Sequence, residues 1–221
     1  MTRTLLFLLL VFITSCRSMA YFDTPNNLRN MQGTVYLSNG RSYDGKLRIQ
    51  TNKYSANAVR LYTEGDKKPM RFGIEEVKAY ELRNGYYELK EVRGGLRIGR
   101  EFSFMKRLTR DNSRIHLFEN TRKVTQSGRY GSSTYYETDY FLQLPGDESN
   151  QVWPLSGSRF VPNFDEKMSK LVADCPALAA KIANKEQGYF YAQVSLFREK
   201  RREVLMNIID DYNDCGTGLL R

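Results

Sequence analysis

Short alternating segments, separated by tight turns, occupy the chain from residue 33 to residue 155. In 33–49, Val35 and Leu37 alternate with polar residues and lead into Asn39-Gly40, a residue pair that two-residue hairpin turns favour. The chain also has 15 tyrosines, and aromatic side chains suit strands. We expect strands within 33–49, 58–63, 70–74, 77–82, 86–92, 101–108, 114–119, 135–144 and 151–155. The Gly/Ser-rich segment 125–134 predicts an exposed loop at a hairpin tip.

The hydrophobic period changes at residue 163. From there to residue 175, apolar side chains recur at the helical spacing i, i+3, i+4 and i+7: Met168, Leu171, Val172 and Cys175. Pro176 begins a second helical stretch, and a third covers about 193–212. Strands followed by helices predict an α+β fold, an antiparallel β-sandwich or rolled β-sheet followed by a C-terminal segment of two to three helices. We expect an antiparallel β domain over 31–160, with a helical segment, 161–221, packed on it.

Residues 1–15 have the composition of a secretory signal. Arg3 precedes an unbroken apolar run, 5–13, and the small polar pair Thr14-Ser15 then leads into Cys16. The run is about half as long as a membrane-spanning helix requires, but it fits the apolar core of a secretory signal peptide. We therefore expect the mature protein to work outside the cytoplasm.

Residues 13–16, Ile-Thr-Ser-Cys, resemble the lipobox of bacterial lipoproteins, in which the signal is cut before the cysteine and that cysteine carries lipid. The resemblance implies that Cys16 is the lipidation site and that 16–30 is a tether. Residue 17 is Arg and not the Asp that retains enteric lipoproteins in the inner membrane. By that analogy we expect a lipid-anchored protein of the outer membrane, on its periplasmic or its surface-facing side. The alternatives are an ordinary signal peptide cut after Ala20 and an uncleaved anchor.

Two cysteines, Cys175 and Cys215, remain once Cys16 is assigned to lipid. In an oxidising compartment, an even pair near the ends of neighbouring helices predicts one structural disulfide. Two buried free thiols are the alternative interpretation. Two cysteines and one distant histidine offer too few ligands for a metal ion, so we expect neither a metal nor a cofactor.

A second resemblance lies between residues 164 and 215. Asp174-Cys175-Pro176 stands at the start of a predicted helix, and Tyr212-Asn213-Asp214-Cys215 closes the last one. This pair of motifs resembles the tail of many uncharacterised envelope lipoproteins from Bacteroidota. The resemblance implies the same disulfide and a cell-envelope source. It carries no known catalytic residues.

The charge of the chain is basic and unevenly distributed. Its 34 Lys and Arg exceed its 25 Asp and Glu, which gives a net charge of +9, and 41% hydrophobic residues exclude general disorder. Outside the cytoplasm, a basic surface meets anionic lipid, lipopolysaccharide or acidic glycan rather than nucleic acid. The segment 93–123 is the most basic, and we expect a candidate anionic-partner face made by Arg93, Arg97, Arg100, Lys106, Arg107, Arg110, Arg114, Arg122 and Lys123.

Catalytic patterns are not evident in the sequence. His116, the only histidine, lies in an alternating strand in which Ile115 and Leu117 face the other way. It has no Gly-x-Ser-x-Gly or His-Glu-x-x-His pattern near it, and the glycine-rich segment 93–99 lacks the following helix of a phosphate loop. We therefore expect no enzyme but a lipid-anchored envelope protein that acts by binding or assembly, on an anionic envelope partner or on other envelope proteins. The alternatives are an envelope enzyme acting on glycans or peptides, and a structural subunit of an envelope multi-protein complex.

Overall fold

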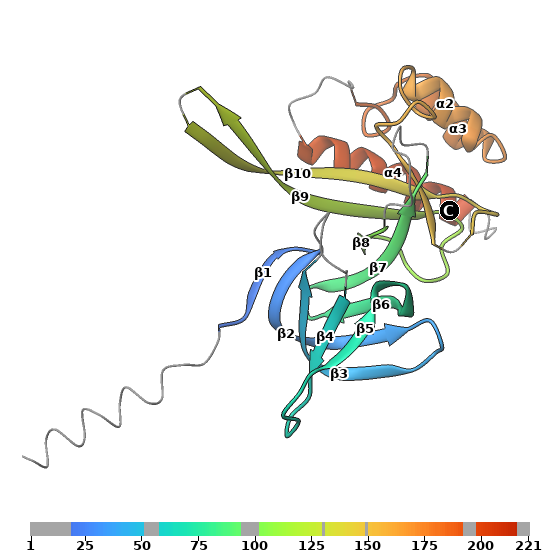
Figure 1. Ribbon diagram of the computed structural model, residues 1–221. Helices are drawn as coiled ribbons and strands as arrows, with labels where there is room; N and C mark the ends of the chain where they lie inside the picture. Colours follow the sequence, from blue (N-terminus) through green and yellow to red (C-terminus); the bar gives the residue numbers. More distant parts are fainter. Residues whose placement is uncertain are drawn as a thin grey trace, which may run out of the picture. The chain divides into compact units, whose positions relative to one another are not determined.

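The computed structural model describes residues 19–50, 58–93, 102–129, 131–148, 150–191 and 198–215 (Figure 1). Mostly antiparallel strands come first, and helices follow near the C-terminus, so the predicted α+β class is confirmed. The chain divides into two compact units, unit 1 over Met1–Arg83 and unit 2 over Asn84–Arg221. The signal segment 1–15 and Cys16 lie outside the described residues.

The boundary between the units differs from the one expected at residue 160. Strands after Arg83 bury one apolar face against the C-terminal helices, in a single core that includes Leu117, Leu142 and Ile208. Those strands therefore form a unit with the helices rather than with the earlier strands. The position of a domain boundary depends on such long-range packing, which an alternating pattern does not reveal.

Unit 1 is an antiparallel sheet whose strand order is β6-β2-β3-β4-β5, with β1 paired to β2. Its elements are β1 (Tyr21–Thr24), β2 (Asn27–Leu37), β3 (Ser42–Gln50), β4 (Ala58–Tyr62), β5 (Met70–Gly73), the short 3-10 turn η1 (Ile74–Glu76) and β6 (Val77–Leu82). Leu47 and Ile49 of β3 and Val59 and Leu61 of β4 are fully buried. Because side chains alternate along a strand, the residues between them point to the opposite face of the sheet.

Residues 21–30, expected as part of the tether over 16–30, are strands in the structure. Tyr21 pairs with Arg29, and Leu28, only 1% exposed, joins the core. The Tyr80 hydroxyl donates a hydrogen bond to the carbonyl oxygen of Pro25 at 2.7 Å, which fixes the turn between β1 and β2. Their alternation was too short to predict strands from the sequence. The described sheet therefore begins at Tyr21, five positions after Cys16.

Unit 2 contains a rolled sheet of β7 (Gly85–Val92), β8 (Phe102–Arg107), β9 (His116–Gly128), β10 (Gly131–Gln143) and β11 (Gln151–Pro154). Neighbours along the chain pair antiparallel from β7 to β11. The last strand, β11, also pairs in parallel with β7, through Gln151 with Glu91 and Val152 with Val92. This pairing joins the first strand to the last, so the sheet closes on itself.

Three helices are described after the strands, α2 (Phe164–Leu171), α3 (Pro176–Ala183) and α4 (Arg198–Cys215). The last of them, α4, lies along the outer face of β9 and β10, and α2 and α3 pack beside it (Figure 1). Ile182 of α3 and Ile209 of α4 are fully buried in the same core as Leu142 of β10. Cys175, just before α3, and Cys215, the last residue of α4, form a disulfide. The predicted cysteine pairing is thus present in the structure.

The segment 125–134 lies at the exposed tip of a hairpin, as predicted, but 125–128 and 131–134 are paired strands and not a loop (Figure 1). Backbone pairing continues to Gly128 opposite Gly131. Threonines face each other across the strands, and the hydroxyls of Thr125 and Thr134 lie 3.2 Å apart, within hydrogen-bonding distance. These cross-strand pairs stabilise the strands despite the Gly/Ser-rich composition.

Candidate functional site

Nine basic residues were predicted as an anionic-partner face, and the seven of them that the structure describes do not share one face of the sheet. Arg97 and Arg100 lie outside the described residues, and Arg93 is exposed just after β7. Lys106 and Arg107 are successive residues of β8, as are Arg122 and Lys123 of β9. Because successive strand residues point to opposite faces, each of these pairs is divided between the two faces of the sheet.

Three of the nine are also neutralised by acids. The ion pairs join Arg107 to Glu88 and Asp111, Arg114 to Asp174, and Arg122 to Glu137 and Asp139. Hydrogen bonding from Arg114, at 2.5 Å, holds the pKa of the Asp174 carboxyl below its usual value. The Arg114 guanidinium also stacks on the Tyr212 ring of α4, 4.4 Å from its centroid. These contacts give Arg114 a place in the attachment of the helices to the sheet.

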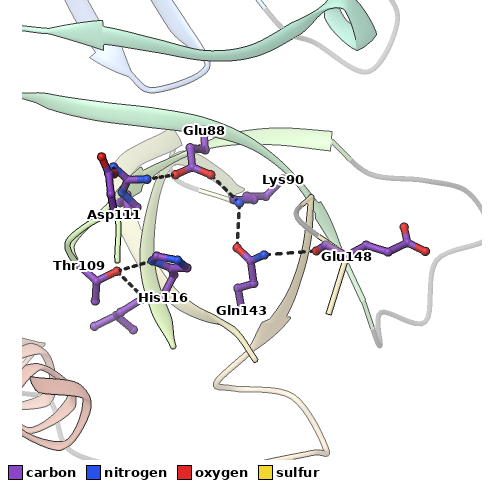
Figure 2. Close-up of polar contacts among 9 residues, drawn as sticks. Glu88, Lys90, Thr109, Asp111, His116, Gln143 and Glu148 are labelled. Carbon is purple, nitrogen blue, oxygen red and sulfur yellow. Dashed lines mark hydrogen bonds and ion pairs between the residues drawn. The ribbon is translucent and has the colours of Figure 1, made fainter. Parts of the chain in front are cut away.

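Charged and polar side chains gather on the inner face of the rolled sheet. Glu88 pairs with Met105 across β7 and β8, and Arg107 pairs with Phe118 across β8 and β9, so all four share one face. Met105 and Phe118 belong to a small apolar cluster on the side of the sheet away from the helices. Figure 2 shows the polar contacts formed beside this cluster. They come from β7, β8, β9, β10 and the loops that follow β8 and β10.

Lys90 is the centre of these contacts and is only 1% exposed. Its Nζ lies 2.6 Å from Glu88 Oε2, donates to Gln143 Oε1 at 3.0 Å, and sits 4.4 Å from the centroid of the Phe118 ring. The other carboxylate oxygen of Glu88 accepts a hydrogen bond from Arg107 Nη1 at 2.7 Å. A buried charge is tolerated when it is paired and hydrogen-bonded in this way.

His116 lies at the edge of the same group and faces away from Ile115 and Leu117, as the alternation predicts. Its Nδ1 is 3.1 Å from Thr109 Oγ1, which also accepts a hydrogen bond from the backbone N–H of Leu117. Burial lowers the pKa of His116, so its imidazole is neutral at pH 7. A catalytic triad would add a carboxylate that orients the imidazole. Within the described part of the chain, the ring's hydrogen-bond partner is Thr109.

Sequence reasoning missed the Glu88–Lys90 pair. Both residues alternate with Tyr87 and Leu89, which is the pattern of a strand with one solvated face. Only the closure of the sheet by β11 places that face inside. The one signal in the sequence that could have indicated this pair is the spacing of two opposite charges at positions 88 and 90. The same spacing is also common on exposed strands, so it does not indicate burial.

The outer part of the β9–β10 hairpin, residues 121–137, is the most exposed regular structure in unit 2, and we call it the arm. Tyr135 is 39% exposed and Tyr136 is 46% exposed. They are neighbours in β10 and therefore lie on opposite faces, Tyr136 opposite Lys123 and Tyr135 opposite Val124. Residues 126–129 and 131–133 at the end of the arm line a shallow hollow of about 550 Å³.

Comparison with protein-family models, with curated proteins and with solved structures finds no match to this chain. In the described ranges, no three His, Cys, Asp or Glu side chains gather as the ligands of a metal ion would. None of the helices described here combines the length and the apolar character that crossing a bilayer requires.

Proposed function

We propose that this protein is a lipid-anchored component of the cell envelope that acts by binding or assembly and not by catalysis. The resemblance of residues 13–16 to a lipobox supports the anchor, with Cys16 as the attachment point. Arg17, in place of the Asp that retains enteric lipoproteins in the inner membrane, supports the outer membrane as the location. The observation that carries the binding role is the arm, whose two strands extend past the helices that pack on the rest of β9 and β10 (Figure 1).

The arm has the surface chemistry of a binding element. A two-stranded hairpin without further packing is marginally stable in water, so maintaining one has a cost that a contact with a partner would offset. Its described residues are mainly Thr, Ser, Gly and Tyr with three basic side chains, Arg122, Lys123 and Arg129. Tyrosine and arginine supply much of the energy of protein interfaces, and serine and glycine adapt around them.

Internal contacts of the arm keep it ordered for this role. Arg122 Nη2 lies 2.7 Å from Glu137 Oε2 across the hairpin, and the Thr121 and Thr138 hydroxyls lie 3.0 Å apart. Such cross-strand pairs reduce the conformational freedom that binding would otherwise have to remove. Among the described residues, Tyr135 then lies on one face of the arm and Tyr136 on the other, which suits a protein partner that encloses the arm. The partner is proposed to be another envelope protein.

The arm is tested by photo-crosslinking in the envelope of the native host. A photoreactive amino acid at Tyr136 should give a discrete crosslinked product, and the same amino acid at Glu186, exposed in the turn after α3, should not. Tyr135→Ser combined with Tyr136→Ser should weaken the partner's binding about 30-fold or more, the size of a hot-spot loss. An arm that gives no product, or products identical to those at Glu186, contradicts this role.

The anchor is tested by labelling the cells with an alkyne-tagged fatty acid. Wild-type protein should incorporate the label and remain in the membrane fraction, because two or more acyl chains give stable attachment. Cys16→Ser should abolish both, while Cys175→Ser with Cys215→Ser, the matched control, should keep the label. An unlabelled wild-type protein whose mature chain begins at Tyr21 would instead establish an ordinary signal peptide.

A further inference from the structure

A row of arginines crosses unit 1, on strands that are distant in sequence but adjacent in the sheet. Arg48 of β3 pairs with Arg60 of β4, and Arg60 pairs with Arg71 of β5. On β2, Leu28 pairs with Ile49 and Met31 with Leu47, so a bulge that contains Arg29 lies opposite Arg48. We call Arg29, Arg48, Arg60 and Arg71 the arginine row.

The arginine row lies on the solvent face of the sheet. Its neighbours along β3 and β4, among them Leu47, Ile49 and Val59, are fully buried, and alternation directs the arginines the other way. Arg29, Arg60 and Arg71 are exposed, and Arg48 is half-buried. Exposed Lys46 stands two positions from Arg48 and extends the row by one more cation on the same face.

The arginine row has no acidic partner among the described residues, and none of its four members forms an ion pair there. The segment 51–57 between β3 and β4 contains no Asp or Glu. Asp44, further along β3, accepts a hydrogen bond from the Thr34 hydroxyl. Like charges directly opposite each other destabilise a sheet, so the Arg–Arg pairs of the row have a cost in stability. On the arm, by contrast, Arg122 stands opposite an acid, Glu137. An uncompensated row of this kind is a natural site for an anion.

The position of the row in the chain points to the source of that anion. Tyr21 pairs with Arg29 at the end of the row and follows Cys16 by five positions. Five residues span at most about 17 Å, so lipid on Cys16 would hold this end of the sheet close to the headgroups. Tyr21, 50% exposed, is a side chain of the kind that gathers at the interface between lipid and water, and nearby Met19 is apolar and 85% exposed.

We infer that the arginine row is the membrane-facing surface of unit 1 and binds the phosphates of anionic phospholipids in the leaflet that holds the Cys16 acyl chains. Guanidinium groups bind phosphate with paired hydrogen bonds, which lysine does not form. This inference rests on the proposed lipid anchor. It assigns the anionic partner to unit 1, and not to the segment 93–123, and it places the sheet against the bilayer without a long tether.

The inference is tested with the unlipidated mature chain from residue 17, which holds every residue that the structure describes. In vesicle sedimentation, this chain should bind phosphatidylcholine vesicles that contain phosphatidylglycerol, and should not bind phosphatidylcholine alone. A basic residue near an anionic surface contributes about five-fold in affinity. Arg48→Gln, Arg60→Gln and Arg71→Gln together should therefore weaken binding about 100-fold, and added salt should weaken binding of the wild type.

The matched control removes the same charge elsewhere in unit 1, with Arg41→Gln, Lys67→Gln and Lys68→Gln, all in exposed turns. It should retain most of the binding, and both variants should unfold at or above the wild-type temperature. Equal losses in the two variants, or equal binding to neutral vesicles, would overturn the inference. Fatty-acid labelling of Cys16 uses no vesicles, so failure of the anchor and failure of the arginine row are distinguishable.

Discussion

Replacing Glu88 with glutamine should lower the free energy of unfolding by about 3–5 kcal/mol, because it removes the negative charge that Glu88 places beside the buried Lys90 ammonium. Glu88 binds two cations, with one carboxylate oxygen 2.6 Å from Lys90 and the other 2.7 Å from Arg107. Glutamine can accept a hydrogen bond from one of them but neutralises neither. The Gln143 oxygen and the Phe118 ring, which also contact Lys90, carry no charge that could replace that of Glu88.

The matched substitution of the partner residue, Lys90→Met, should lower the free energy of unfolding by much less. Lys90→Met removes the buried cation and keeps a side chain of similar length, and Glu88 keeps its ion pair with Arg107. Combining Glu88→Gln with Lys90→Met should lower the free energy of unfolding by less than the sum of the two single changes, since the two side chains contact each other in the wild type. Urea unfolding followed by circular dichroism gives the three free energies. Equal decreases in the free energy of unfolding of the Glu88→Gln and Lys90→Met variants would contradict this prediction.

Local signals in the sequence predicted the elements of the fold. Alternation around Asn39-Gly40 predicted the β2–β3 hairpin, and the helical spacing of Met168 and Val172 predicted α2. Both signals depend on residues within a few positions of each other, where side-chain direction follows from strand or helix geometry. The Cys175–Cys215 pairing was also predictable, because few cysteines were available to pair.

The candidate surfaces were not predictable, because each depends on strand register. Arg48, Arg60 and Arg71 form a row only because β3, β4 and β5 pair at those positions, and a slip of one residue would disperse it. The sequence drew attention to 93–123 instead, where basic residues are dense along the chain. In that segment, successive side chains fall on opposite faces, and Arg107 and Arg122 are paired with acids. A high density of basic residues along the chain is thus a poor guide to their density on the surface of the folded protein.

The units also differ in how they use their arginines. In unit 2, Arg107 and Arg114 bind Glu88 and Asp174 and join elements of the fold. In unit 1, the arginine row joins nothing within the described chain. Side chains that satisfy one another stabilise a structure, and uncompensated ones are expected where a partner completes the contacts. This contrast supports an external role for the arginine row and a structural role for Arg107 and Arg114 of unit 2.

Removing the disulfide should be the other severe change in unit 2. Cys175→Ser with Cys215→Ser should lower the free energy of unfolding by roughly 4 kcal/mol, since the bond closes a loop with a sequence separation of 40. The folded state should persist, because α4 has other contacts with the sheet. Asn213 Oδ1 accepts hydrogen bonds from the backbone N–H groups of Arg114 and Ile115, at 2.8 and 3.1 Å.

The cause of this loss can be separated from a loss of native packing by the slope of the urea transition. A cross-link restricts the unfolded chain, so its removal should raise the slope as well as lower the midpoint, because the freed chain exposes more surface. Wild-type protein in reducing agent should reproduce both changes, and the double variant should not respond to reducing agent. A lower midpoint with an unchanged slope would instead assign the loss to the folded state, where Cys175 is packed in the core beneath α3 and α4.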